Sequence, residues 1–197
     1  MSSEARQLEQ QLTTSVSLDE LLAELRAIGD PNRRPEAVDA LLASACVDEQ
    51  TLARHLHFAP RRYTRNLVYR DERFELLVLC WDRGVRSPVH GHAGQQCWFI
   101  PVAGAFDLED YRILDGGREP GPARLERTLV RRGVGPGALD RRSPDADVHG
   151  IAVARGTRRA VSLNLYARPI DACLVYDLAA GTCALRRLRY DSYGGVM

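Results

Sequence analysis

Residues 87–99 read SPVHGHAGQQCWF, and this stretch decides how the rest of the chain is interpreted. It holds two of the five histidines, His90 and His92, just after an apolar run. Alternate residues of an extended backbone point to the same side, so two imidazoles spaced this way on a strand can converge on one metal ion. Gly84 precedes the pair, and Gly104 marks a hairpin before the next run, AFDLEDY. The stretch therefore predicts a metal site built on strands.

The residues on either side of this stretch favour a barrel. From Tyr63 onward, short apolar or alternating runs are broken by Gly, Pro, Asn and Asp, which is typical of a β-sandwich or barrel. These runs are FELLVLCW, CWFIPVAG, AFDLEDYRI, ARLERTLV, VHGIAVA, AVSLNLYA and ACLVYDL. Helices followed by strands indicate an α+β, mainly β fold, an antiparallel barrel with an N-terminal helical cap.

The first third of the chain predicts three helices. Ser17 and Glu20 form a capping-box pattern, and leucines follow at helical spacing until Gly29. A second helix is expected over residues 35–45 and a third over residues 48–56. Neither a linker nor a repeat divides the sequence, so we expect one domain over residues 1–197, helical in 1–60 and a barrel in 63–190.

Composition excludes several classes of protein. The hydrophobic fraction is 45% and the charged fraction 27%, near globular averages. No segment approaches the roughly 20 apolar residues that span a bilayer. The net charge is +1 and basic residues alternate with acids, so we expect no nucleic-acid partner and no membrane. The first residues lack the apolar run of a secretory signal, which favours the cytoplasm.

The five cysteines are odd in number and scattered, which argues against a disulfide framework and a thiolate zinc site. We expect Cys80, Cys173 and Cys183 to be packing residues. Trp81, Trp98, Phe99 and Phe106 are likewise expected in the core. His55 and His57 lie near the end of the third predicted helix, where a surface or helix C-terminal role is expected.

The spacing of Gly84, His90, His92 and Gly104 resembles the first cupin motif, which implies a jelly-roll barrel. Most cupins place a glutamate four or five residues after the second histidine, where this chain has Cys97. The second cupin motif supplies another histidine, and His149 is its candidate. Val153 stands where that motif usually has an asparagine.

Cys97 at the glutamate position, together with Tyr63-Thr-Arg-Asn66, resembles the cysteine dioxygenases. The similarity runs from about Tyr63 to Asp177. It implies that His90, His92 and His149 hold Fe(2+), and that the protein is an oxidoreductase of cysteine catabolism. It would add both atoms of O2 to the thiol of L-cysteine, giving the sulfinate. Three neutral imidazoles leave the charge of the metal intact, which suits an anionic thiolate ligand.

The resemblance also assigns further residues. It implies that Arg65 binds the substrate carboxylate through its guanidinium fork and that Tyr63 adds a hydroxyl. It implies a thioether between Cys97 and Tyr166 beside the iron. In the family, the tyrosine that matches Tyr166 ends a Ser-x-His-x-Tyr run, whose three named residues hydrogen-bond to one another in sequence. Here that run is Ser162, Asn164 and Tyr166, and an amide cannot shuttle a proton as imidazole can.

Two alternatives remain open. One is a dioxygenase for another small thiol such as 3-mercaptopropionate or cysteamine, although Arg65 argues against cysteamine, which has no carboxylate. The other is a non-catalytic cupin that binds metal or a small ligand as a sensor. Three histidines are also compatible with zinc. No exposed apolar seam is evident, so a monomer is expected.

Overall fold

The protein is described by a computed structural model over residues 14–196. Helix α2 (Leu18–Ile28) begins with the predicted capping box, in which Ser17 Oγ accepts from the Glu20 amide and Glu20 accepts from the Ser17 amide. It ends at Gly29, whose φ of 90° favours glycine. Helix α3 (Pro35–Ser44) follows as predicted. The third predicted helix is a 3-10 helix, η1 (Glu49–His55).

A short parallel pair of strands, β1 (Thr14–Val16) and β2 (Ala45–Val47), lies within the N-terminal part, for which only helices and turns were expected. The strand pair was not expected, because pairing between residues 31 positions apart, such as Thr14 and Ala45, leaves no local pattern. The predicted strand runs are confirmed, and further strands of two to eight residues join them.

Two larger sheets form the body of the fold. Except for the parallel pair β14 and β3, all neighbours in them are antiparallel, which confirms the mainly β class. The first sheet has the order β14 (Ser192–Tyr193), β3 (Tyr63–Arg70), β4 (Glu75–Asp82), β11 (Arg159–Tyr166), β6 (Cys97–Ala103) and β9 (Asp140–Arg142). The second closes on itself through β10 (Val148–Val153), β5 (Val89–His90), β12 (Ala172–Asp177), β13 (Thr182–Arg187), β8 (Gly121–Val134) and β7 (Phe106–Gly116).

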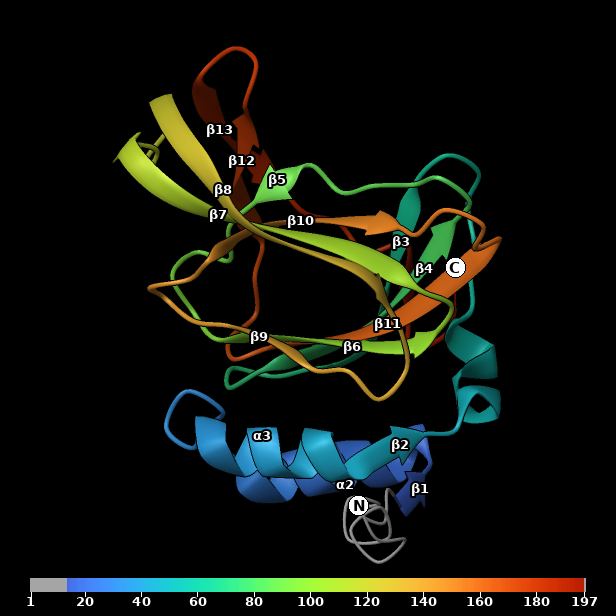
Figure 1. The fold of residues 1–197 in the computed structure, drawn as a ribbon. Coiled ribbons are helices and arrows are strands. Elements are labelled where there is room, and N and C mark those ends of the chain that lie inside the picture. The colour runs from blue at the N-terminus through green and yellow to red at the C-terminus, as the bar shows by residue number, and fades with distance from the viewer. Residues whose placement is uncertain (1–13, 197) are drawn as a thin grey trace, which may run out of the picture.

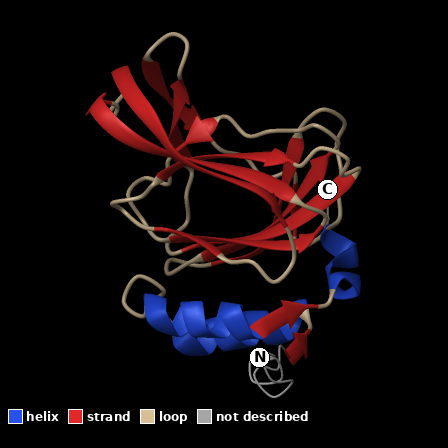
Figure 2. Cartoon of the chain, in the orientation of Figure 1, coloured by secondary structure: helices blue, strands red, loops and turns tan. Residues whose placement is uncertain are grey.

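The helices cover one face of the first sheet, as Figures 1 and 2 show. Strands β7, β8 and β10 lie on the opposite side, so the first sheet is sandwiched between a helical layer and the second sheet. This arrangement confirms the predicted barrel with an N-terminal helical cap. The β14 strand extends the barrel slightly past residue 190, the predicted boundary.

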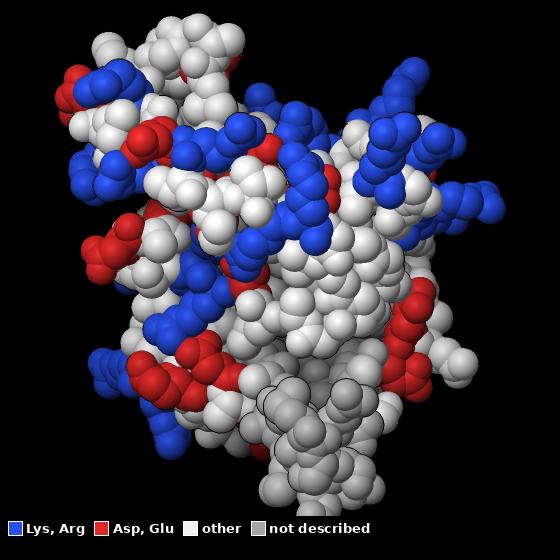
Figure 3. Space-filling model, in the orientation of Figure 1, with Lys and Arg blue, Asp and Glu red and all other residues white. Residues whose placement is uncertain are grey.

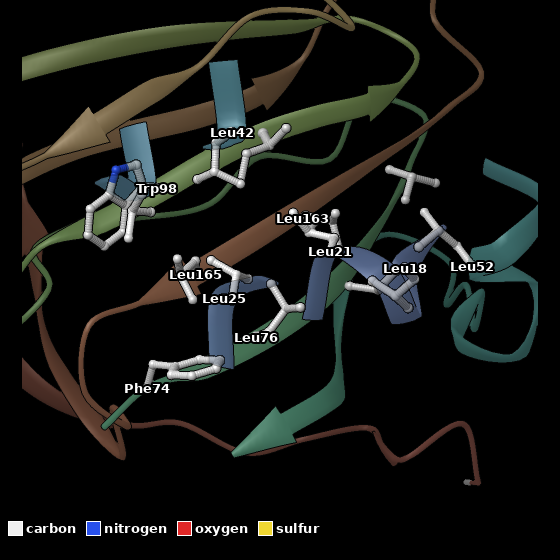
Figure 4. Close-up of a cluster of buried hydrophobic side chains, with 14 of the residues drawn as sticks. Leu18, Leu21, Leu25, Leu42, Leu52, Phe74, Leu76, Trp98, Leu163 and Leu165 are labelled. Carbon is white, nitrogen blue, oxygen red and sulfur yellow. The ribbon is translucent and has the colours of Figure 1, made fainter. Parts of the chain in front are cut away.

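Strand β11 is buried on both faces and serves both layers. Val161, Leu163 and Leu165 belong to the apolar core shared with the helices. The alternate residues Ser162, Asn164 and Tyr166 are also buried and face the barrel interior. Figure 4 shows Leu18, Leu21 and Leu25 of α2 beside Leu163 and Leu165.

The same alternation holds in β4 and β6. Leu76, Val78 and Cys80 contact the helical layer, whereas Leu77, Leu79 and Trp81 point into the barrel. Trp98 faces the helices, and its Nε1 donates to Asp39 Oδ1 at 2.7 Å. The four aromatic residues expected in the core, Trp81, Trp98, Phe99 and Phe106, are at most 1% exposed.

On the face seen in Figure 3, arginines and acidic residues are interspersed over the surface. Many form ion pairs across neighbouring strands, such as Arg112 with Glu126 and Arg132 with Asp107. Among the described residues, no helix is both long and apolar enough to cross a bilayer.

The two-layer packing of β11 generates a prediction. Leu163→Ala should lower the free energy of unfolding by about 2–5 kcal/mol, because it opens a cavity between sheet and helices. Its side chain points away from the interior, so metal content should stay near one ion per chain. Urea unfolding with metal analysis checks both. Leu185→Ala, at a side chain 61% exposed, is the control and should change little. Loss of metal in folded Leu163→Ala protein would contradict the separation of the two faces.

Candidate metal and substrate site

Three histidines from two distant parts of the chain, residues 90–92 and residue 149, meet inside the barrel. His90 ends β5 and lies directly opposite His149 of β10 in the strand register. His92 follows in the loop after β5, not on a strand as the H-x-H pattern suggested. One ligand nitrogen from each ring lies within 4.8 Å of the others. His92 and His149 are each only 1% exposed. The structure thus brings together all three predicted ligands.

The hydrogen bonds of these rings leave nitrogens free for a cation. Nδ1 of His90 lies 3.0 Å from the Pro88 carbonyl oxygen, and Nδ1 of His92 lies 2.9 Å from Asp147 Oδ1. Within residues 14–196, neither ring nitrogen of buried His149 has a hydrogen-bond partner. A buried polar nitrogen without a partner is costly. The donor set therefore fits a divalent metal held by three imidazoles whose other nitrogens are oriented by the protein.

The protonation of the cluster is also consistent with a cation site. Burial, aided by neighbouring His92, lowers the pKa of His90 to about 3, and burial lowers that of His149 well below its usual range. Burial tends to lower the pKa of His92 as well, but the effects of Cys97 and Asp147 are larger and raise the His92 pKa to about 10. Two rings are thus neutral, the form that ligates metals, and a metal would displace the proton from the third.

Asp147 is a residue whose role the sequence did not reveal. Its Oδ1 accepts from the backbone N–H of His92 at 2.7 Å as well as facing the ring. A Cβ on Gly91 would lie 2.8 Å from Asp147 Oδ2, so the glycine between the two histidines makes room for this carboxylate. Asp147 supports His92 and does not join the group of ligand atoms.

Asp140 of β9 supports His149 in a similar way. Its Oδ2 lies 3.6 Å from His149 Nδ1, and Arg142 and Arg131 both contact the carboxylate. Burial tends to raise the pKa of Asp140, but the nearby His149 ring and the Arg142 guanidinium hold it well below its usual range. An ionised carboxylate behind His149 orients the imidazole. Only tertiary contacts identify this residue, because nothing local marks it.

A pocket opens beside the histidines. Its wall includes His90 and His92. The other lining residues include Tyr63, Arg65, Trp81, Asn164, Tyr166, Cys173, Arg186 and Leu188. The predicted substrate-binding residues Tyr63 and Arg65 therefore share one cavity with two of the three predicted metal ligands, His90 and His92.

Arg65 presents part of its guanidinium to this pocket. It is 7% exposed, and its Nη2 lies 3.3 Å from Oε1 of the buried Glu75. Its Nε has no partner within the described chain. Burial tends to lower the pKa of Arg65, but Tyr166 and Glu75 raise it, so the residue stays charged. Tyr63 stacks on Trp81 with ring centroids 4.5 Å apart, and burial raises its pKa.

Cys97 and Tyr166 are direct cross-strand partners of β6 and β11. Directly opposite residues have Cβ atoms about 4.5–5.5 Å apart on one face of the sheet. Both side chains are buried, at 0% and 4% exposure. Burial and then Cys97 raise the pKa of Tyr166, so its phenol stays protonated. The pair predicted from the resemblance is placed side by side.

The polar run on β11 is linked only in part. Trp81 Nε1 donates to Ser162 Oγ at 3.1 Å, and Ser162 Oγ donates to Asn164 Oδ1 at 2.9 Å. In the described residues, the chain of hydrogen bonds stops at Asn164 and does not reach the Tyr166 hydroxyl. The expected run through all three members is therefore not formed in this structure.

The remaining histidines lie outside the site. His55 is in the last turn of η1, as expected, but it is 1% exposed, so a surface role was wrong. Arg54 Nε donates to its Nε2 at 3.1 Å, and burial lowers its pKa. The His57 ring lies 3.3 Å from the Gly195 carbonyl oxygen. Cys80, Cys173 and Cys183 are buried as expected, although Cys173 also lines the pocket.

Comparison with known proteins identifies similar sequences among the cysteine dioxygenases. The family model described as Cysteine dioxygenase type I matches residues 8–179. Cysteine dioxygenase type 1 of Danio rerio is 29% identical over 157 residues, covering 74% of this chain and 71% of the relative. The Rattus norvegicus enzyme is 29% identical over 169 residues, covering 85% and 81%.

Among solved structures, a double-stranded beta-helix protein from Klebsiella pneumoniae is similar, with a TM-score of 0.45 and 15% identity, covering 64% of this chain and 94% of that one. A cupin protein from Desulfovibrio desulfuricans has a TM-score of 0.41 and 20% identity, covering 58% and 91%. The family model spans most of the sequence, including every residue of the predicted site. The chain belongs to the cysteine dioxygenase type I family.

Proposed function

We propose that this protein is an iron(II) thiol dioxygenase that converts L-cysteine and O2 to cysteine sulfinate. The observation that carries the proposal is the junction of the three-histidine cluster with a pocket containing the partly unpaired Arg65. A metal site and an anion-binding group in one cavity suit a small thiol that also bears a carboxylate. The reaction balances, because one thiol and one O2 give one sulfinic acid.

His90, His92 and His149 would hold the metal. When bound, ferrous iron supplies the redox chemistry that makes dioxygen reactive toward the thiol. The protein supplies orientation around it. Asp147 and Asp140 keep two of the rings aimed inward, and the apolar walls of the pocket limit access of water.

Arg65 and Tyr63 would bind the carboxylate of the substrate. The free Nε of Arg65 can donate a charge-assisted hydrogen bond, and the Tyr63 hydroxyl lines the same cavity. Tyr166 lies between Arg65 and the histidines, with its ring centroid 5.6 Å from Arg65 Cζ and 6.0 Å from the His92 ring. Its protonated phenol can donate a hydrogen bond to the reacting groups without large rearrangement. Asn164 lines the pocket beside it, and Ser162 donates a hydrogen bond to the Asn164 amide oxygen.

A direct assay separates the candidate functions. Iron-loaded protein prepared under argon and then exposed to oxygen with a panel of thiols should consume O2 and form cysteine sulfinate. Preferred turnover of 3-mercaptopropionate or cysteamine would identify another thiol dioxygenase. Stoichiometric metal with no O2 uptake for any thiol would support the non-catalytic metal-binding alternative.

The first prediction from the site concerns the metal. His90→Ala, His92→Ala and His149→Ala should each lose most of the iron, because two imidazoles hold a divalent ion much more weakly than three. Metal analysis of purified protein gives iron per chain. His57→Ala lies outside the cluster and should retain the wild-type content. Full metal content in His149→Ala would show that the ligand set is wrong.

A second prediction concerns the carboxylate. Arg65→Lys should raise KM for cysteine by about tenfold or more, because a charge-assisted hydrogen bond is worth roughly 1.5–3 kcal/mol and the fork geometry is lost. KM for cysteamine, which has no carboxylate, should change much less. Steady-state kinetics with both thiols checks this. If stability falls while KM for cysteine stays the same, Arg65 is structural only.

A third prediction concerns Cys97 and Tyr166. We expect a thioether between Sγ and a ring carbon of the tyrosine, formed as dioxygen takes up the two hydrogens released. Intact mass should show a population lighter by the mass of two hydrogens, and a tryptic digest should contain the joined peptides after reduction. Because no hydrogen bond runs from Asn164 to the phenol, formation should be incomplete in fresh protein.

Cys97→Ser is the matched variant for this link. It should lack the lighter population and keep its iron, since the metal is assigned to histidines alone. Loss of iron in that variant, with no linked peptide in the native protein, would instead make Cys97 a metal ligand.

A further inference from the structure

A buried acid stands behind the carboxylate-binding arginine. Glu75 begins β4 and is 0% exposed. It lies directly opposite Tyr166 in the register of β4 and β11, so both side chains project from the same face of the sheet, toward the interior. A buried carboxylate is retained only where specific partners compensate its charge.

The partners of Glu75 are unequal. Oε1 lies 3.3 Å from Arg65 Nη2, and Oε2 accepts from the Tyr190 hydroxyl. Arg70 Nη1 is 3.6 Å from Oε2, but Arg70 also forms a bidentate pair with Asp171 at 2.9 and 3.0 Å. Asp171 thus balances Arg70, and Glu75 is left as the counter-charge of Arg65.

This pairing occupies one nitrogen of the Arg65 guanidinium and leaves another without a partner. Nη2 faces Glu75, whereas Nε is buried, unpaired and part of a residue that lines the pocket. A substrate carboxylate that binds Arg65 must therefore share it with a carboxylate already present. Two carboxylates on one guanidinium repel each other, and burial strengthens that repulsion.

We propose that Glu75 is a positioning and specificity-determining residue that orients Arg65 and sets how strongly the pocket prefers acid-bearing thiols. It holds the guanidinium fork in one orientation while the pocket is empty, and it offsets part of the attraction for a carboxylate. The inference rests on the proposed function, since it takes Arg65 as the group that binds the substrate.

Glu75→Gln is the test, because the amide keeps the shape and can still accept from Arg65. Under argon, calorimetric Kd for L-cysteine with iron-loaded protein should fall by about fivefold or more as the competing charge is removed. KM for cysteine should fall with it. Kd for cysteamine should stay the same or rise, since cysteamine offers no carboxylate to the uncompensated arginine.

A measurement on the metal-free protein tests independently how far Glu75 neutralises the charge of Arg65. Acetate should raise the Tm of metal-free Glu75→Gln by binding to the guanidinium, and at the same concentration it should raise the wild-type Tm much less. Glu109→Gln is the matched control, since Glu109 pairs with Arg86 and Arg127 outside the pocket. It should change neither thiol affinity nor the response to acetate.

Several outcomes would overturn the inference. Equal changes in Kd for cysteine and cysteamine would reduce Glu75 to a structural role, and weaker cysteine binding would show that it helps the carboxylate bind. If Glu75→Gln does not fold, Glu75→Asp decides. Its carboxylate lies one methylene further from Arg65. The ratio of the Kd for cysteine to the Kd for cysteamine should therefore change in the same direction by a smaller factor. An unchanged ratio would contradict the proposal.

Failure of the proposed function gives a different result. In that case no thiol is oxidised by the wild-type protein, yet the acetate measurement still reports whether Glu75 neutralises Arg65.

Discussion

The structure depends on burying both faces of one sheet. In β3, β4, β6 and β11, alternate residues point to opposite sides, and each side has its own packing partner. The helical layer takes Leu163, Leu165 and Trp98 on one side, while the barrel interior takes the intervening residues on the other. Because side chains alternate strictly along a strand, packing of the outer residues fixes the direction of the inner ones. The site is therefore held by the same contacts that hold the fold together.

A second constraint is the cost of burying ionisable groups inside the barrel. Three groups of the site each have an acidic neighbour, with Asp147 beside His92, Asp140 beside His149 and Glu75 beside Arg65. Burial makes an unpaired charge costly, so these acids permit histidines and an arginine to lie where a metal and an anionic substrate can reach them. None of the three acids is a proposed ligand. They decide which nitrogens remain free.

Asn164 shows how one substitution changes such a network. Its amide oxygen accepts from Ser162, which in turn accepts from Trp81, and the chain ends there. Tyr166 is left to packing, to the charge of Arg65 and to its neighbour Cys97 for its position. A covalent link to Cys97 would supply an orientation that no hydrogen bond from Asn164 provides. The departure from the family pattern thus affects the tyrosine more than the metal ligands.

The sequence by itself determined the class of fold and the residue types of the site. The capping box at Ser17, the strand runs and the H-x-H spacing are local patterns, and local patterns record which face of an element is buried. The family resemblance was needed to place His149, Arg65 and Tyr166 in one site, because their separation in sequence does not predict how far apart they lie in space. Only the tertiary structure decided that His92 lies in a loop, that Asn164 ends a hydrogen-bond chain, and that Asp140, Asp147 and Glu75 stand behind the site. The physical reason is that the counter-charge of a buried group is set by strands packed against it from elsewhere in the chain, and a single acidic residue in a strand looks the same in sequence whether it faces solvent or a buried arginine.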